Sequence, residues 1–186
     1  MKTKRRTFRQ FIKAAFIALV TFGIQSCETE IPPEDITPPE FSFQINGDGF
    51  YHVFDQDSDY DNIRLELKAG ATYDFTYTVF DEGGLAGAYW SREDVWKIRT
   101  TFRGQPLWSN YYGHNGIYGS INWSGDRSNP VSGATVTGFF EVRDEGYDTT
   151  SFTFSAVDFG GDDEMLNRIQ KRLRVRISDG PTRILR

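Results

Sequence analysis

From residue 41 onward, apolar and polar residues alternate along most of the chain. In the segment 73–79, for example, Tyr73, Phe75, Tyr77 and Val79 alternate with polar side chains. A period of two with one apolar face is typical of half-buried β-strands. Strands are predicted at 41–45, 51–54, 63–67, 73–79, 96–102, 107–111, 120–123, 135–142, 152–156 and 172–177, and a helical turn only at 163–169. Because strand follows strand with turn residues between them, we expect one all-β domain, a β-sandwich, over residues 41–186.

The first 26 residues have a different pattern. Six basic side chains, from Lys2 to Lys13, precede a mostly apolar run at 14–24. This is the layout of a secretory signal. A helix that spans a bilayer needs about 20 apolar residues, and this run is shorter. The string Ile24-Gln25-Ser26-Cys27 resembles a lipobox, which implies removal of residues 1–26 and a membrane anchor through lipid on Cys27. An ordinary signal peptide is the alternative, and the Arg5-Arg6 pair leaves twin-arginine export open beside general secretion.

Residues 27–40 are the predicted linker. Residues 28–40 contain four prolines and five acidic side chains, a composition that predicts an extended, self-repelling spacer. An acidic stretch just after a lipidated cysteine resembles the surface-export signals of Gram-negative, Bacteroidetes-type lipoproteins. The resemblance implies an outer-membrane lipoprotein at the cell surface. A plain tether on the periplasmic face is the alternative.

Charge and composition exclude several classes of function. Without residues 1–26 the chain carries 15 basic and 26 acidic side chains, a net charge of −11, so we expect no nucleic-acid partner. The single cysteine excludes an intrachain disulfide and a cysteine-cluster metal site. The sequence has no nucleophile elbow, phosphate-binding loop or zinc signature, and we therefore expect no enzyme.

Short motifs suggest a family for the predicted sandwich. They are Asp35-Ile36-Thr37-Pro38-Pro39, Asp81-Glu82-Gly83-Gly84-Leu85 after a strand, the segment 95–103 with Trp96, and Val157-Asp158-Phe159-Gly160-Gly161 between the strands at 152–156 and 172–177. Together they resemble bacterial immunoglobulin-like or PKD-like domains. The resemblance implies an immunoglobulin-like β-sandwich in which 95–103 is strand C and Trp96 is its core tryptophan. It implies no activity, because this fold hosts many functions.

An acidic string at 55–62 is the candidate metal site. Asp55, Asp57, Asp59 and Asp61 alternate with other residues, and carboxylates so spaced can converge on Ca²⁺ when a loop curls around the ion. Tyr60 stands where an EF-hand needs glycine, so an EF-hand is not expected. The alternatives are a different calcium loop formed by the four aspartates, or a solvated acidic turn.

Aromatic side chains concentrate between residues 89 and 123. Trp108, Tyr111, Tyr112, His114 and Tyr118 lie in a Gly-rich segment and are the candidate ligand-binding residues. Aromatic faces beside polar groups suit a glycan, and aromatic residues are also enriched at protein interfaces. The alternative is packing, which we expect for Trp96 and Trp123.

Basic residues concentrate at the C-terminal end. From residue 165 onward there are seven basic side chains and one acidic one, whereas residues 28–164 have a net charge of −17. Arg172, Arg174 and Arg176 share one face of a predicted strand. They would pair with acids on neighbouring strands, protect a sheet edge, or meet a partner or lipid headgroups.

These observations favour an exported binding or accessory module on a lipid anchor. A glycan ligand in a polysaccharide-uptake context is the leading hypothesis. The alternative is a structural or adhesive surface protein that binds other proteins, with Ca²⁺ as a candidate cofactor.

Overall fold

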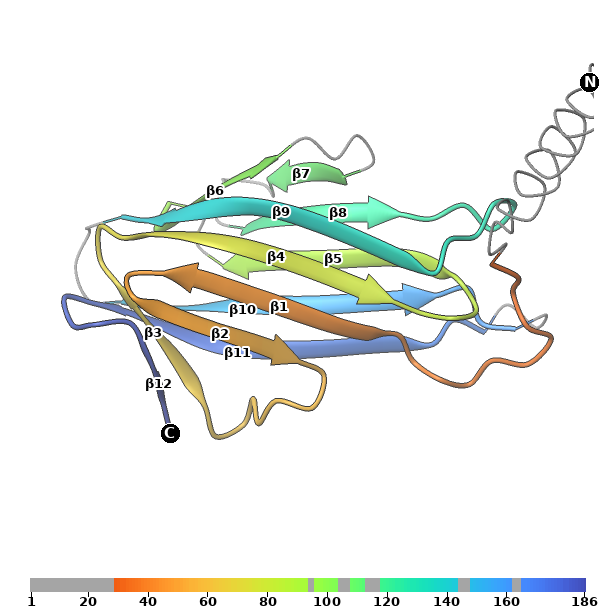
Figure 1. Ribbon diagram of the computed structural model, residues 1–186, viewed down its shortest axis with the longest axis horizontal. Helices are drawn as coiled ribbons and strands as arrows, with labels where there is room; N and C mark the ends of the chain where they lie inside the picture. Colours follow the sequence, from red (N-terminus) through yellow and green to blue (C-terminus); the bar gives the residue numbers. More distant parts are fainter. Residues whose placement is uncertain (1–28, 94–95, 104–107, 113–117, 144–147, 162–164) are drawn as a thin grey trace, which may run out of the picture.

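The computed structural model describes residues 29–93, 96–103, 108–112, 118–143, 148–161 and 165–186, and these form two β-sheets packed face to face (Figure 1). Cys27 lies outside the described residues. No helix in the described part of the chain is long and apolar enough to cross a bilayer.

The first sheet has five antiparallel strands in the order β2-β1-β4-β9-β6. Their bounds are β1 Glu40–Gly47, β2 Phe50–Asp55, β4 Thr72–Phe80, β6 Ile98–Arg103 and β9 Gly133–Val142. The second sheet has seven strands in the order β12-β3-β11-β10-β5-β8-β7. Their bounds are β3 Arg64–Lys68, β5 Leu85–Glu93, β7 Trp108–Tyr112, β8 Tyr118–Ser124, β10 Asp148–Asp158, β11 Arg168–Ser178 and β12 Arg183–Leu185.

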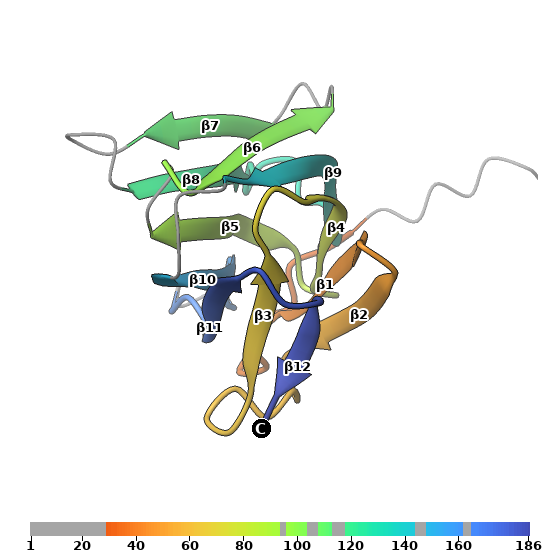
Figure 2. The same ribbon diagram turned by 90° about the vertical axis from the view of Figure 1, so that its left-hand side faces the viewer.

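The strand order is that of an immunoglobulin-like sandwich. Strands β1, β4, β9 and β6 take the places of A, B, E and D, and strands β5, β10 and β11 take those of C, F and G. Strand β11 pairs with β3 in parallel, whereas the other strand pairs of both sheets are antiparallel. Figure 2 shows the two sheets from the end of the sandwich. The predicted fold class is therefore confirmed.

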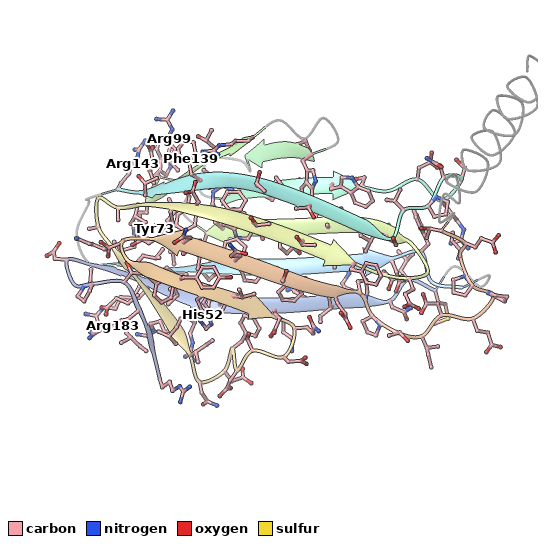
Figure 3. The ribbon with its side chains drawn as sticks, in the orientation of Figure 1. His52, Tyr73, Arg99, Phe139, Arg143 and Arg183 are labelled. Atoms are coloured by element: carbon pink, nitrogen blue, oxygen red, sulfur yellow. The ribbon has the colours of Figure 1, made fainter. Side chains whose placement is uncertain are left out.

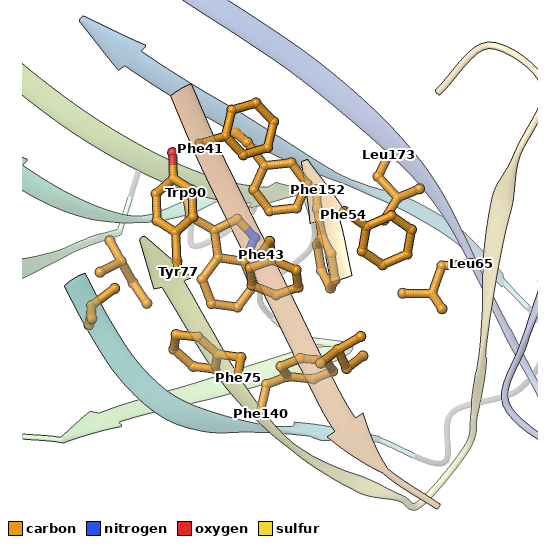
Figure 4. Close-up of a cluster of buried hydrophobic side chains, with 14 of the residues drawn as sticks. Phe41, Phe43, Phe54, Leu65, Phe75, Tyr77, Trp90, Phe140, Phe152 and Leu173 are labelled. Atoms are coloured by element: carbon orange, nitrogen blue, oxygen red, sulfur yellow. The ribbon is translucent and has the colours of Figure 1, made fainter. Parts of the chain in front are cut away.

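The core lies between the sheets and is built mainly from aromatic rings. Trp90 on β5 is at its centre, with ring centroids 4.8 Å from Phe43 and 4.6 Å from Phe75 (Figure 4). Phe152 meets the same indole edge-on at 5.4 Å. Contacts of this kind add to the free energy that each ring gains by leaving water.

The sequence prediction assigned strand C to the wrong segment. Strand C is β5, and its core tryptophan is Trp90, which has an exposed fraction of 0%. Trp96 precedes β6 and is 57% exposed, so the prediction that it fills the core was wrong. The pairing of β5 with β10 shifts register between Val157 and Asp158, and this bulge places Leu85 and Ala88 on the buried side. Strict alternation is lost there, which hid the strand.

Two smaller expectations also need correction. Residues 165–167 are not helical, and Arg168 and Ile169 belong to β11; the rest of the predicted helical turn lies outside the described residues. Strand β11 is not an edge strand, because it lies between β3 and β10. Its arginines therefore do not protect a sheet edge.

Candidate metal centre

The predicted calcium loop does not gather its carboxylates around one point. Asp55 Oδ1 accepts hydrogen bonds from Asp57 N at 3.1 Å and Ser58 Oγ at 2.9 Å, and Asp59 accepts from Asn62 Nδ2 at 3.0 Å. Asp57, Asp59 and Asp61 are exposed. The loop folds instead around an aromatic anchor, since the buried Tyr60 donates its hydroxyl to Asp55 O at 2.7 Å. The four aspartates are therefore not gathered as a metal-binding group in the described residues, and the geometry favours the alternative of a solvated acidic turn.

One of the predicted aromatic binding residues, Trp108, is buried in the core of the structure. Trp108 is only 7% exposed and packs edge-on against Tyr77 inside the sandwich, with ring centroids 6.2 Å apart. It faces inward because β7 pairs with β8 so that Trp108 lies beside the buried Trp123. His114 and the side chains of Tyr111, Tyr112 and Tyr118 lie outside the described residues.

A different set of carboxylates comes together at one end of the sandwich. Asp35, Asp81 and Asp158 each place a carboxylate oxygen within 4.8 Å of the others. In the described part of the chain, these three side chains are the group that lies close enough together to hold one metal ion. Asp35 precedes β1, Asp81 follows β4 and Asp158 ends β10. Three segments that are distant in sequence thus meet where these strands begin or end (Figure 1).

Asp158 is fixed by the loop that follows it. It is fully buried, and its Oδ1 accepts hydrogen bonds from Gly160 N at 2.7 Å and Asn167 N at 2.9 Å. Asn167 Nδ2 donates to Asp158 Oδ2 at 3.0 Å and to Asp35 O at 2.9 Å. Asn167 therefore joins the β10–β11 loop to the segment that carries Asp35.

Asp81 is fixed by the turn between β4 and β5. Its backbone N–H donates to Ser132 O at 2.8 Å, and its Oδ1 accepts from Gly83 N at 2.9 Å. The side chain is buried, and none of the ion pairs among the described residues involves Asp81, Asp35 or Asp158. Buried negative charges without a cation are unfavourable, because they have lost hydration without gaining a counter-charge.

Residues 29–39, which we name the N-terminal strap, pack against this end of the sandwich. Two glycines admit the strap: a Cβ at Gly161 would lie 2.5 Å from Pro33 O, and one at Gly83 would lie 2.5 Å from Asp35 Oδ2. Arg127 supports the loop beneath, donating to Phe159 O at 2.8 Å and to Gly161 O at 2.9 Å. The strap has no regular secondary structure, as expected, but it is a docked segment and not a free spacer.

A pocket of about 330 Å³ opens beside the cluster. Its lining includes Asp35 and Asp81, together with Glu40, Glu82 and the exposed ring of Phe80. The pocket gives an ion a route to the carboxylates from solvent, which a metal site requires.

The burial and the negative charges of the cluster change the pKa of Asp81. Burial, followed by the nearby charges of Asp158 and Asp35, raises the pKa of Asp81 from 3.8 to about 6. The folded chain therefore takes up a proton at a pH where the unfolded chain does not. In the absence of metal, the contribution of Asp81 to stability is greatest at low pH and is lost as the pH rises through about 6.

We expect Asp81→Asn to raise the melting temperature of the metal-free protein at pH 7.5, because an amide removes the buried charge. The gain should shrink toward zero at pH 5, where wild-type Asp81 is protonated. Thermal melts in EDTA across this range measure it. Burial lowers the pKa of His52, which acts in the opposite direction in this window, so the difference between variant and wild type is the relevant quantity. An equal difference at both pH values would contradict the expectation.

A repeated pattern in the sequence marks two members of the cluster. Asp81-Glu82-Gly83-Gly84 and Asp158-Phe159-Gly160-Gly161 both read Asp-x-Gly-Gly, and each follows a strand. The sequence analysis treated these segments as turns of an immunoglobulin-like fold and did not single out their carboxylates as candidate ligands. Asp35 has no comparable signal beyond the prolines that flank its segment.

Comparison with known proteins identifies no family for the chain. No family model matches it, and no curated protein matches it. Among solved structures, it is similar to a cohesin module from a Clostridium perfringens family 33 glycoside hydrolase, with a TM-score of 0.37 and 10% sequence identity. The likeness covers 63% of this chain and 97% of that module. It is too distant to carry an argument about function.

Proposed function

We propose that the chain is a lipid-anchored surface module, structural or adhesive, in which Ca²⁺ clamps the N-terminal strap to the sandwich. The observation that carries this proposal is the group Asp35, Asp81 and Asp158, whose oxygens lie within 4.8 Å of one another. One of these residues belongs to the strap and two belong to the sandwich. A cation held by all three would tie the two parts together.

The ligand set suits calcium. Ca²⁺ takes oxygen ligands at 2.3–2.6 Å, so two ligands of one ion lie at most about 5 Å apart. The three carboxylates meet this limit, and together they supply up to three negative charges, two of them on the buried Asp81 and Asp158. Calcium also tolerates irregular geometry and bound water, whereas Mg²⁺ demands a near-ideal octahedron. Water in the adjoining pocket would complete the coordination.

The clamp gives the module a mechanical role at a membrane. Lipid on Cys27 would lie only two residues before Thr29, where the described strap begins. With the strap docked, little free chain separates the anchor from the sandwich, and the clamped end faces the membrane. The opposite end, with the β1–β2 turn and the β3–β4 turn, is then displayed outward (Figure 1). Because Trp108 is a core residue, this role is better supported than a glycan platform.

Calcium titration tests the proposal. We expect the mature chain, residues 27–186 with Cys27→Ser to leave out the lipid, to bind one Ca²⁺ per molecule in isothermal calorimetry. Asp35→Asn and Asp81→Asn should each weaken binding at least tenfold, because each removes a charged ligand. Asp57→Asn is the matched control, since it removes an exposed carboxylate from the 55–62 turn, and it should leave binding unchanged.

The position of the strap is a second readout of the same titration. A glutamate-specific protease should cut after Glu30 and Glu34 slowly in Ca²⁺ and rapidly in EDTA. The proposal fails if no calcium binds, or if Asp57→Asn weakens binding as much as Asp81→Asn does. Calcium binding without protection of the strap would reject the clamp.

A further inference from the structure

A group of arginine side chains lies on the outer face of the seven-stranded sheet. The side chains of β11 alternate, so that Leu173, Val175 and Ile177 are buried while the residues between them are exposed. We name the exposed set the arginine face. It consists of Arg168, Arg172, Arg174 and Arg176 on β11, Arg64 on β3 and Arg183 on β12. Figure 3 labels Arg183, which lies at the start of β12.

Strand pairing brings the arginines side by side. Arg174 on β11 lies directly opposite Arg64 on β3. Two residues further along, Glu66 on β3 lies between Arg176 on β11 and Arg183 on β12. From Arg168 to Arg176 the row extends about 27 Å at the usual rise per residue of a strand. Like charges in directly opposite positions repel, so the pair Arg64 and Arg174 favours an anion.

Only two carboxylates pair with this face among the described residues. The buried carboxylate of Glu66 lies 2.7 Å from Arg183 Nε and 3.7 Å from Arg176 Nε, and Glu93 lies 2.6 Å from Arg172. Arg174 donates to the backbone oxygen of Asp61. These contacts use few of the five N–H groups of each guanidinium. The paired arginines remain between 44% and 61% exposed, so most donors point to solvent.

The neighbouring strand keeps the face open. On β10, Thr149, Ser151 and Thr153 lie opposite Arg176, Arg174 and Arg172. These short hydroxyl side chains do not cover the guanidinium groups, and Ser151 Oγ accepts a hydrogen bond from Arg172 Nε at 3.0 Å. The result is a broad surface of guanidinium and hydroxyl donors, with Leu185 beside Arg64 and Tyr89 on β5 at its margins.

We propose that the arginine face docks the domain onto an anionic lipid surface by binding phosphate headgroups. The planar guanidinium fork matches phosphate oxygens in pairs. A membrane presents phosphates as an extended layer, and an extended row of donors complements such a layer. The rest of the mature chain has a net negative charge and is repelled by the same surface, which favours an approach through this face. A domain docked through this face lies on its side, whereas a domain held by its lipid anchor alone stands with the clamped end toward the membrane.

The inference is tested without the lipid anchor, so that its failure is separate from failure of the proposed function. The mature chain with Cys27→Ser is sedimented with vesicles of phosphatidylglycerol and phosphatidylcholine, and with vesicles of phosphatidylcholine alone. EDTA is present, so that calcium cannot bridge acidic residues to lipid. We expect binding to the anionic vesicles only, with at least a tenfold loss between 50 and 500 mM salt, because salt screens exposed charges.

Matched triple variants locate the surface. The triple variant Arg64→Gln, Arg168→Gln, Arg174→Gln removes three arginines that form no ion pair within the described residues, and it should lower vesicle binding at least tenfold. The triple variant Arg99→Gln, Arg103→Gln, Arg143→Gln removes the same charge near β6 and β9, away from the arginine face, and should bind as wild type does. Equal losses in both variants, or no binding to anionic vesicles, would overturn the proposal. Retention on a heparin column without vesicle binding would also overturn it, since the partner would then be a sulfated polymer.

Discussion

Replacing Trp90 by alanine is expected to lower the free energy of unfolding by about 3–5 kcal/mol. The indole is fully buried and contacts rings from both sheets, including Phe43, Phe75 and Phe152. Removing it leaves a cavity that the surrounding strands cannot close, because the other large side chains of the core hold the two sheets apart. Urea denaturation followed by tyrosine fluorescence or circular dichroism measures the change.

Trp96→Ala is the matched control for this experiment. It removes the same side chain from a position that is 57% exposed, so we expect a change of at most about 0.5 kcal/mol. The pair of variants tests directly which tryptophan belongs to the core of strand C. A larger loss for Trp96→Ala than for Trp90→Ala would contradict the structure.

Asp158→Ala is expected to cost about 2–4 kcal/mol and to abolish stabilisation by calcium. The substitution leaves Gly160 N and Asn167 N buried without their acceptor, and each unsatisfied donor costs about 1–3 kcal/mol. It also frees Asn167, which holds Asp35 of the strap. Relief of repulsion with Asp81 offsets part of this cost in EDTA, so the difference from wild type should be larger in saturating Ca²⁺.

Asp126→Ala provides the comparison, because Asp126 makes the same kind of turn at the same end of the sandwich. Its Oδ1 accepts from Ser128 N at 2.9 Å and Ser128 Oγ at 2.7 Å, but the residue is exposed and water can replace these bonds. We expect a loss below about 1 kcal/mol and an unchanged response to calcium. Thermal melts with and without Ca²⁺ measure both quantities. If Asp158→Ala kept the wild-type response, Asp158 would not be a ligand.

Most of the strands were predictable because alternation is a local property. Tyr73, Phe75, Tyr77 and Val79 show the inward face of β4 without any knowledge of its neighbours. Strand β5 was not predictable in this way, since its bulge and its buried Arg92 break the alternation. Without β5, Trp96, which lies just before the next strand, was assigned to the core.

The carboxylate cluster that the structure forms is not the one that sequence spacing favoured. Sequence spacing favoured Asp55, Asp57, Asp59 and Asp61, because close neighbours along the chain are the simplest way to gather carboxylates. In the structure, the Tyr60 anchor turns that segment into an ordinary acidic loop. The cluster that does form takes single aspartates from the strap, the β4–β5 turn and the end of β10.

The sequence by itself determined the all-β class, most of the strands and the faces they bury. The reason is that the alternation of apolar and polar residues along a strand is a local property of the sequence. It also predicted the N-terminal signal and the concentration of arginine on β11. The tertiary structure alone decided which loops meet, since the order of strands in the two sheets brings Asp35, Asp81 and Asp158 to one end. It likewise decided that Arg64 and Arg183 join β11 in one surface, because the pairing of β3 between β12 and β11 depends on contacts between residues far apart along the chain.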